Sequence, residues 1–234
     1  MNFVINPKVF ENFPDLSVGV IIATDIDNSC KSPEIEEMLR NEEESITKRL
    51  DIDSYRDNPK LSALQEVHRS FGNNPNKFPP SIQGLVKRIL KGGSLPIINP
   101  IVDLYNIISL RHLVCAGAED FDTCSGDIQL DYANGTESFI PLGENVEDPP
   151  KEGELVYKDD IGVICRKLNW REGDRTKITD GTKNALIVLE GFSPFAKEDL
   201  EQALNELSEY LIKYCNAETS IKILTKEILE CSVK

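Results

Sequence analysis

The densest cluster of chemically useful side chains lies in residues 170–177. This segment holds the chain's only tryptophan, three cations and a turn glycine, in the order Trp170, Arg171, Glu172, Gly173, Asp174, Arg175, Thr176 and Lys177. Arginine can make paired hydrogen bonds to a phosphate, and tryptophan can stack on a nucleobase. We therefore predict a ligand-facing loop whose contacts are Trp170, Arg171, Arg175, Thr176 and Lys177. In the structural alternative, Arg171 and Arg175 pair with neighbouring acids and Trp170 packs in the core.

Two further polar residues stand beside apolar segments. Glu190 follows the apolar residues 185–189 and precedes Gly191, which predicts a carboxylate at the end of a buried strand. There it can meet an amino or hydroxyl group of a substrate, or it can be a surface acid. Asn106 can fix a carbonyl group or a water, or make a packing hydrogen bond. We select Glu190 and Asn106 as candidate catalytic residues.

No metal or cofactor is predicted. The six cysteines are scattered, without a CxxC pair or a histidine at zinc spacing. The acidic segment 24–27 lacks the ligand count and glycine spacing of a calcium loop. His68 and His112 lie among apolar neighbours and are expected to be packing residues. The cations of residues 87–91 are expected on a solvated helix face.

Composition limits the partners. The chain has 26 Lys and Arg against 40 Asp and Glu, for a net charge of −14, which repels a phosphate backbone on average. Contact with RNA then needs a local basic patch or a protein partner. The 234 residues are 40% hydrophobic, enough for one folded unit over residues 1–234. We see no signal peptide or long apolar run, so no membrane contact is expected, and the predicted location is the cytoplasm.

Periodicity predicts an α+β fold with mixed β-sheets and packed helices. Helices are expected in the part before about residue 110, at 32–50, 58–70, 81–91 and 99–108. Strands dominate from about 111 to 234: a hairpin at 128–142 turning at Asn134-Gly135, a second at 155–165, and strands at 185–189 and 221–224. A strand at 16–22 and a helix from Ser193-Pro194 complete the pattern, and Ser32 is expected to cap the helix at 32–50.

Three segments resemble a known family. Residues 95–106 (LPIINPIVDLYN) contain an Asn-x-x-Val-Asp-x-x-Asn run, residues 166–179 read RKLNWREGDRTKIT, and residues 182–190 read TKNALIVLE. They are similar to the B3/B4 domain of the phenylalanyl-tRNA synthetase β chain and to its free-standing relatives. The resemblance implies a B3/B4 fold with a pocket between lobes. It also implies that tRNA or aminoacyl-tRNA is a weakly bound partner, held by a local basic patch.

The same resemblance implies a function in removing wrongly attached amino acids from tRNA, without amino-acid activation. Glu190 corresponds to the glutamate that lines the synthetase editing pocket, and Tyr105 stands in the substrate region where threonine is common. Gly117 takes the place of the editing-pocket histidine. Three functions follow: an aminoacyl-tRNA deacylase acting in trans, a non-catalytic module for RNA, amino acid or partner protein, or an enzyme for a small amino-acid-like metabolite.

Overall fold

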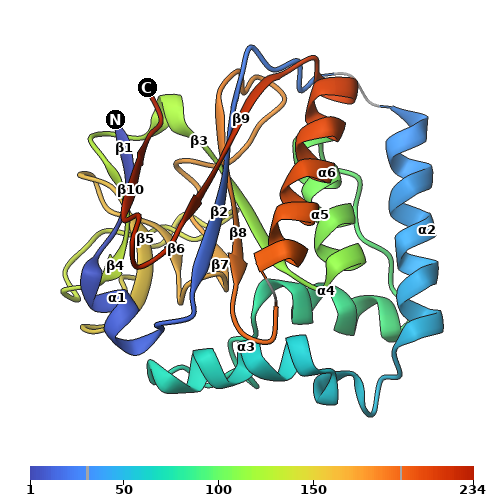
Figure 1. The fold of residues 1–234 in the computed structure, drawn as a ribbon, viewed down its shortest axis with the longest axis horizontal. Coiled ribbons are helices and arrows are strands. Elements are labelled where there is room, and N and C mark those ends of the chain that lie inside the picture. Colours follow the sequence, from blue (N-terminus) through green and yellow to red (C-terminus); the bar gives the residue numbers. More distant parts are fainter. Residues whose placement is uncertain (30–31, 196) are drawn as a thin grey trace.

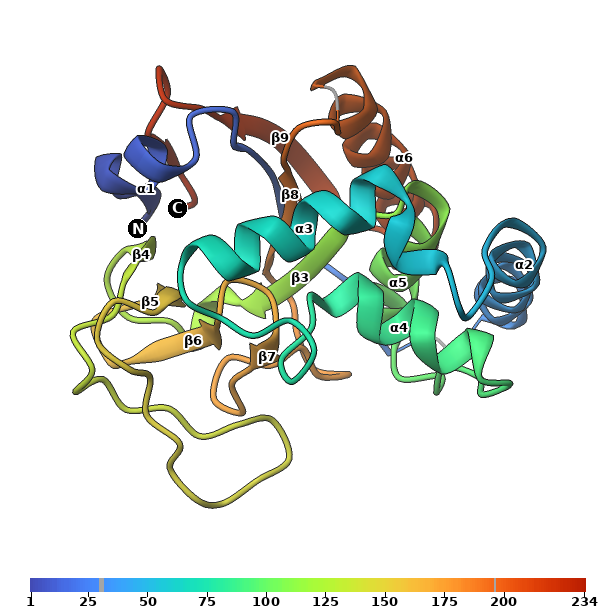
Figure 2. The ribbon, with the colours of Figure 1, turned by 90° about the horizontal axis from the view of Figure 1, so that it is seen from below.

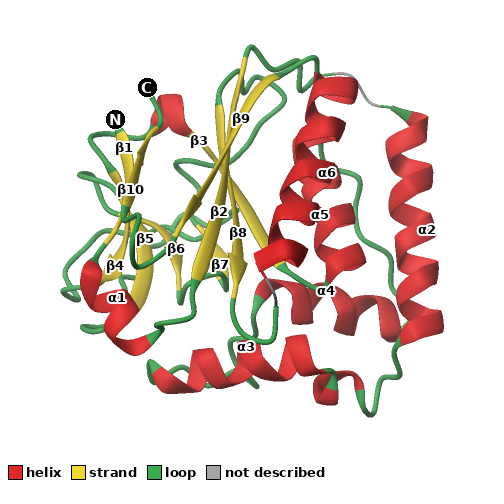
Figure 3. Ribbon diagram, in the orientation of Figure 1, coloured by secondary structure: helices red, strands yellow, loops and turns green. Residues whose placement is uncertain are grey.

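Two β-sheets lie face to face, and helices cover the far side of one of them (Figures 1 and 3). The computed structural model describes residues 1–29, 32–195 and 197–234. The antiparallel four-stranded sheet has the order β3 (Cys115–Asp120), β8 (Ala185–Gly191), β2 (Ser17–Thr24) and β9 (Glu218–Leu224). The mixed six-stranded sheet has the order β10 (Glu230–Ser232), β1 (Asn2–Ile5), β4 (Ile128–Tyr132), β5 (Leu155–Lys158), β6 (Val163–Arg166) and β7 (Arg171–Glu172).

The helices form the other layers. They are α1 (Pro7–Asn12), α2 (Pro33–Arg49), α3 (Pro59–Ser70), α4 (Ser81–Leu90), α5 (Pro100–His112) and α6 (Lys197–Cys215). Helices α5 and α6 pack together beside the four-stranded sheet, and α2 packs outside α5. In the described residues, no helix is long and apolar enough to cross a membrane.

Strand β8 shows why the candidate site lies where it does. All its residues are buried because α6 packs against one face while the six-stranded sheet faces the other. Alternation along the strand turns Leu186, Val188 and Glu190 toward the six-stranded sheet. On neighbouring β2, Gly19 lets α6 approach closely, because a Cβ there would lie 2.5 Å from Leu204 Cδ1.

Residues at the N-termini of the helices predicted most of the helix positions. Helices α1, α3 and α5 each begin with an Asn-Pro pair, in which Asn6, Asn58 or Asn99 accepts a hydrogen bond from a first-turn amide. The fixed φ of proline suits the first helical position, and its missing N–H has no partner to lose there. Ser32 makes no capping hydrogen bond, contrary to our expectation. Helix α6 begins at Lys197 rather than at Ser193-Pro194.

The α+β class with mixed sheets is confirmed, but the hairpin predicted at 128–142 is wrong. Strand β4 pairs instead with β5, with Leu130 opposite Tyr157. The turn does form, since Gly135 has a φ of +85°. However, the Glu137 carboxylate accepts hydrogen bonds from the backbone amides of Asn134 and Gly135, and the chain leaves the sheet as a long loop. The hairpin at 155–165 is confirmed by the pairing of β5 with β6.

Candidate functional site

Glu190 lies in a small cavity between the two sheets, which we call the inter-sheet cavity. Its lining includes Gly117 and Glu119 of β3, Glu190 of β8, Tyr157 of β5, Glu172 of β7 and the nearby Asn169. The cavity measures about 20 Å³, room for roughly one water. Glu190 is only 4% exposed, so the candidate carboxylate faces the interior rather than the surface.

Two donors hold the Glu190 carboxylate. Tyr157 Oη donates to Oε1 at 2.9 Å, and Asn169 Nδ2 donates to Oε2 at 3.4 Å. Burial raises the pKa of Glu190 to about 7, against the effect of these two hydrogen bonds. Burial and the charge of Glu190 raise the pKa of Tyr157 well above its ordinary value, so the phenol remains a donor. Glu190 can therefore exchange a proton near neutral pH.

A chain of buried side chains continues outward from Asn169. His68 Nε2 lies 3.2 Å from Asn169 Oδ1, and Asn73 Nδ2 lies 2.6 Å from His68 Nδ1. Burial lowers the pKa of His68 to about 4, so its imidazole is neutral at pH 7. With the amides as assigned, Nε2 donates to Asn169 and Nδ1 accepts from Asn73. His68 is buried, as expected of a packing residue, and it also orients the amide that holds Glu190.

Two more carboxyl groups, those of Glu119 and Glu172, line the same cavity, and Glu172 lies in front of Gly117. A Cβ at Gly117 would lie 2.8 Å from Glu172 Oε1, so the glycine leaves room for this carboxyl. Burial raises the pKa values of both Glu119 and Glu172, and the charge of Glu172 raises that of Glu119 further. Such a pair favours sharing one proton. Glu172 Oε2 has no hydrogen-bond partner in the described residues.

Of the two residues predicted on α5, Tyr105 lies near this pair. Burial, followed by the charges of Glu172 and Glu119, raises the pKa of the Tyr105 hydroxyl, which places Tyr105 near the carboxyl pair. Asn106 is buried on α5 with 9% exposure. It is absent from the lining of the inter-sheet cavity as the described residues define it.

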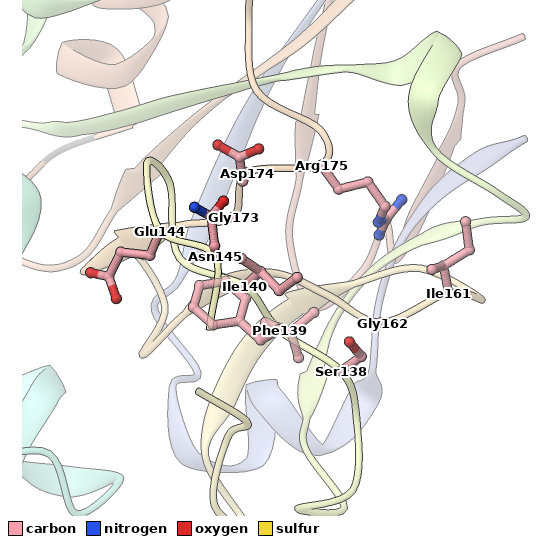
Figure 4. Close-up of a pocket in the computed structure, with 11 residues that line it drawn as sticks. Ser138, Phe139, Ile140, Glu144, Asn145, Ile161, Gly162, Gly173, Asp174 and Arg175 are labelled. Carbon is pink, nitrogen blue, oxygen red and sulfur yellow. The ribbon is translucent and has the colours of Figure 1, made fainter. Parts of the chain in front are cut away.

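The residues of the predicted loop at 170–177 do not share one pocket in the described part of the chain. Residues 171 and 172 form β7, so alternation sends Glu172 into the cavity and Arg171 to the opposite side, where it pairs with Glu144 at 2.5 Å. Arg175 pairs with Asp159 at 2.7 Å and lines a separate hollow of about 290 Å³ (Figure 4). Lys177 pairs with Asp174 at 2.8 Å, and Thr176 is buried.

Trp170 lines yet another pocket, which we call the Trp170 pocket. Its volume is about 490 Å³, and its walls include Phe71, Asn73, Lys77, Phe78, Lys151 and Trp170. Asn73 belongs both to this wall and to the hydrogen-bonded chain that ends at Glu190. Among the described residues, no three His, Cys, Asp or Glu side chains form a metal-binding group.

The model of the B3/4 domain family matches residues 63–216, well over half of the chain. The chain belongs to the B3/4 domain family. This confirms the family predicted from the sequence. The matched range of the B3/4 domain includes the whole hydrogen-bonded chain from Asn73 to Glu190, together with Gly117 and Glu172.

A solved structure shows a more distant similarity. It is the crystal structure of an N-terminal fragment of the phenylalanyl-tRNA synthetase β-subunit from Pyrococcus horikoshii, with 16% identity and a TM-score of 0.48. The alignment covers 93% of this B3/4 domain protein and 49% of that fragment, so the protein spans about half the fragment's length. No curated protein sequence matches it.

Proposed function

We propose that this B3/4 domain protein is a deacylase that acts in trans on mischarged aminoacyl-tRNA, with Glu190 as its general base. The observation that carries the proposal is the buried Glu190 carboxyl, which has a pKa of about 7 beside a cavity with room for one water. Proton transfer is most effective when the pKa of the base lies near the working pH. A buried carboxyl with these donors suits that task.

The proposed step begins with a water in the cavity. Glu190 takes a proton from this water while the water oxygen forms a bond to the ester carbonyl carbon. The resulting tetrahedral intermediate breaks its bond to the ribose oxygen, which receives the proton from Glu190. The products are the free amino acid and the uncharged tRNA end. Tyr157 and Asn169 hold the carboxylate in place during both transfers.

Substrate entry requires the cavity to open, because about 20 Å³ cannot hold an aminoacyl group. The segment that carries Asn169 is the proposed moving part. Its two preceding residues, Lys167 and Leu168, both have left-handed backbone conformations, with φ of 51° and 65°. Strained backbone of this kind gathers at ligand-binding and switching segments. We propose that movement of residues 167–169 admits the ester.

We propose a smaller role in the reaction for Asn106 than for Glu190. Asn106 is buried and follows Tyr105 on α5. We propose that it supports the packing of this helix rather than contacting the reacting atoms. Asn106→Ala should therefore slow turnover for every substrate, but less than Glu190→Gln does.

The test is single-turnover deacylation of a panel of misacylated tRNAs by four forms of the full chain: wild type, Glu190→Gln, Asn106→Ala and the control Glu37→Gln. Glu37 is an exposed residue of α2, and its variant makes the same chemical change. Glu190→Gln should lose about 100-fold or more in rate, and Glu37→Gln should match the wild type. Wild-type hydrolysis that survives Glu190→Gln would remove Glu190 as the base.

A non-catalytic binding module is the second candidate, favoured by one observation. Arg171, Arg175 and Lys177 are all paired with acids, which limits the cations that the predicted loop offers to tRNA. If no member of the panel is hydrolysed, the same tRNAs and free amino acids should be tested by equilibrium dialysis. Binding without turnover would favour the module, and a protein partner would then supply the remaining RNA affinity.

A further inference from the structure

The Trp170 pocket is open and chemically unlike the inter-sheet cavity. It lies where the loop between α3 and α4 passes the segment that follows β6 (Figure 2). Residues 148–154 close its third side. Its volume of about 490 Å³ is in the range of small-molecule sites.

Asn73, which lines this pocket, carries a buried acceptor without a partner among the described residues. The residue is 8% exposed, and its Nδ2 group donates to His68 Nδ1 at 2.6 Å and to the Phe78 carbonyl at 2.8 Å. Its Oδ1 atom is buried and has no hydrogen-bond partner among the described residues. Because a buried acceptor without a donor is costly, a ligand N–H group would complete this site.

Aromatic rings form the adjoining wall. Phe78 packs edge-to-face on Trp170 with ring centroids 4.6 Å apart, and Phe71 lines the same pocket. Trp170 remains partly exposed, unlike the fully buried aromatic residues of the core. Planar ligands with a π-face are favoured by such a wall.

Charged side chains of both signs complete the arrangement. The carboxylates of Asp148, Glu152 and Glu154 line the pocket together with its cations, and Lys77 Nζ lies 4.9 Å from the centroid of the Phe78 ring. Arg166 and Lys167 share the Glu154 carboxylate, with Arg166 Nε and Lys167 Nζ 2.7 and 2.5 Å from its oxygens, and Arg166 also pairs with Asp148 at 2.5 Å. Lys77 and Lys151 are exposed on the same pocket, and neither forms a salt bridge within the part of the chain that the structure describes. These two lysines are available for an anion, although the whole chain carries a net charge of −14.

We propose that the Trp170 pocket binds a nucleotide whose base carries an exocyclic amino group. The base lies against Trp170 and Phe78, its amino group donates to Asn73 Oδ1, and its phosphate is held by Lys77 and Lys151. This chemistry fits a free mononucleotide or the 3′ end of an RNA. The site needs no hydrolysis, so it can be correct even if the deacylase proposal fails.

Trp170 provides the measurement, because it is the only tryptophan of the chain. Its fluorescence should change saturably when the wild-type protein is titrated with AMP. Purine riboside 5′-phosphate, which lacks the amino group, should bind about tenfold more weakly. Lys151→Glu should weaken AMP binding by about tenfold or more. The control Lys91→Glu makes the same charge change at an exposed lysine just after α4 and should leave the affinity within about twofold.

The two ligand sources are separated by a short single-stranded RNA ending in CCA. Tighter binding of this RNA than of AMP would assign the pocket to an RNA end, and tighter AMP binding would assign it to a free nucleotide. The proposal is overturned if neither ligand changes the fluorescence at millimolar concentration. It is also overturned if inorganic phosphate alone gives the same affinity as AMP, or if Lys91→Glu weakens binding as much as Lys151→Glu.

Discussion

The inter-sheet cavity and the Trp170 pocket lie at opposite ends of one hydrogen-bonded chain and have opposite properties. The cavity measures about 20 Å³ and is lined by carboxyl groups whose pKa values are raised by burial. The pocket measures about 490 Å³ and presents aromatic rings, four cations and three carboxylates. Asn73 lines the pocket and Glu190 lines the cavity, with His68 and Asn169 between them. Proton transfer needs the first environment, while capture of an anionic ligand needs the second.

The first expected effect concerns the pH dependence of deacylation. Glu190 acts as a base only when ionised, and its pKa is about 7. Its hydrolytic rate, after subtraction of uncatalysed ester hydrolysis, should therefore rise with pH and level off above pH 7. At pH 6 it should be about tenfold below the plateau. Single-turnover rates between pH 5.5 and 8 measure this, and a flat profile for an active wild-type protein would contradict the cavity's role in proton transfer.

The next effect concerns the pH dependence of stability. It tests His68, which connects the Trp170 pocket with the inter-sheet cavity. His68 has a folded-state pKa of about 4, below the ordinary value of 6.5. As pH falls from 6.5 to 4, the unfolded chain binds a proton that the folded chain excludes, so stability should decrease. The change should reach roughly 3 kcal/mol relative to His68→Gln, which can keep both hydrogen bonds but does not titrate.

Urea unfolding of both forms at several pH values measures this difference. His68→Leu is the companion variant, because it removes both hydrogen bonds and should be destabilised at every pH. A difference between wild type and His68→Gln that stays constant with pH would mean that His68 is not the buried neutral link described above.

Sequence patterns predicted the family, most of the helices, strand β8 and the position of Glu190 at its end. They could not connect His68 with Asn169, because 101 residues separate the two and each looks ordinary in its own segment. The sequence did not identify Glu172 as a cavity residue, because the neighbouring cations favoured the prediction of a ligand-binding loop. The two-residue strand β7 is too short to show the alternation that separates Arg171 from Glu172.

A smaller effect is expected for the salt dependence of RNA binding. With Lys77 and Lys151 as the phosphate contacts, log affinity should fall with log salt concentration with a slope of about −1.4, near −0.7 per contact. Affinity should then fall roughly sevenfold between 50 and 200 mM salt. Titration of the CCA-ended RNA at both concentrations measures the slope, and Lys151→Glu should halve it. A slope steeper than about −4 would require cations beyond this pocket.

The smallest effect is expected for the substitution Arg171→Ala. Arg171 was predicted from the sequence to be one of the ligand contacts. Its guanidinium pairs with Glu144, and the two side chains are 37% and 50% exposed. Exposed pairs of this kind contribute little, so stability should change by less than about 0.5 kcal/mol. Affinity for AMP should stay within about twofold, because Arg171 is absent from the Trp170 pocket as the described residues define it.

Arg166→Ala is the matched contrast to Arg171→Ala, since it removes the same side chain from a different environment. Arg166 and Glu154 form a pair in which both side chains are 5% exposed. Arg166→Ala leaves the buried Glu154 with Lys167 as its remaining cation, and loss of the charge-assisted hydrogen bonds from Arg166 should cost roughly 1.5–3 kcal/mol. Both variants lose one positive charge, but only Arg166 is buried. Thermal unfolding and the Trp170 fluorescence titration of both variants therefore show whether the effect on stability comes from burial of the arginine or from its charge. A tenfold loss of AMP or RNA affinity in a fully folded Arg171→Ala protein would mean that the loop at 170–177 binds the nucleotide. The proposed assignment of nucleotide binding to the Trp170 pocket alone would then be wrong.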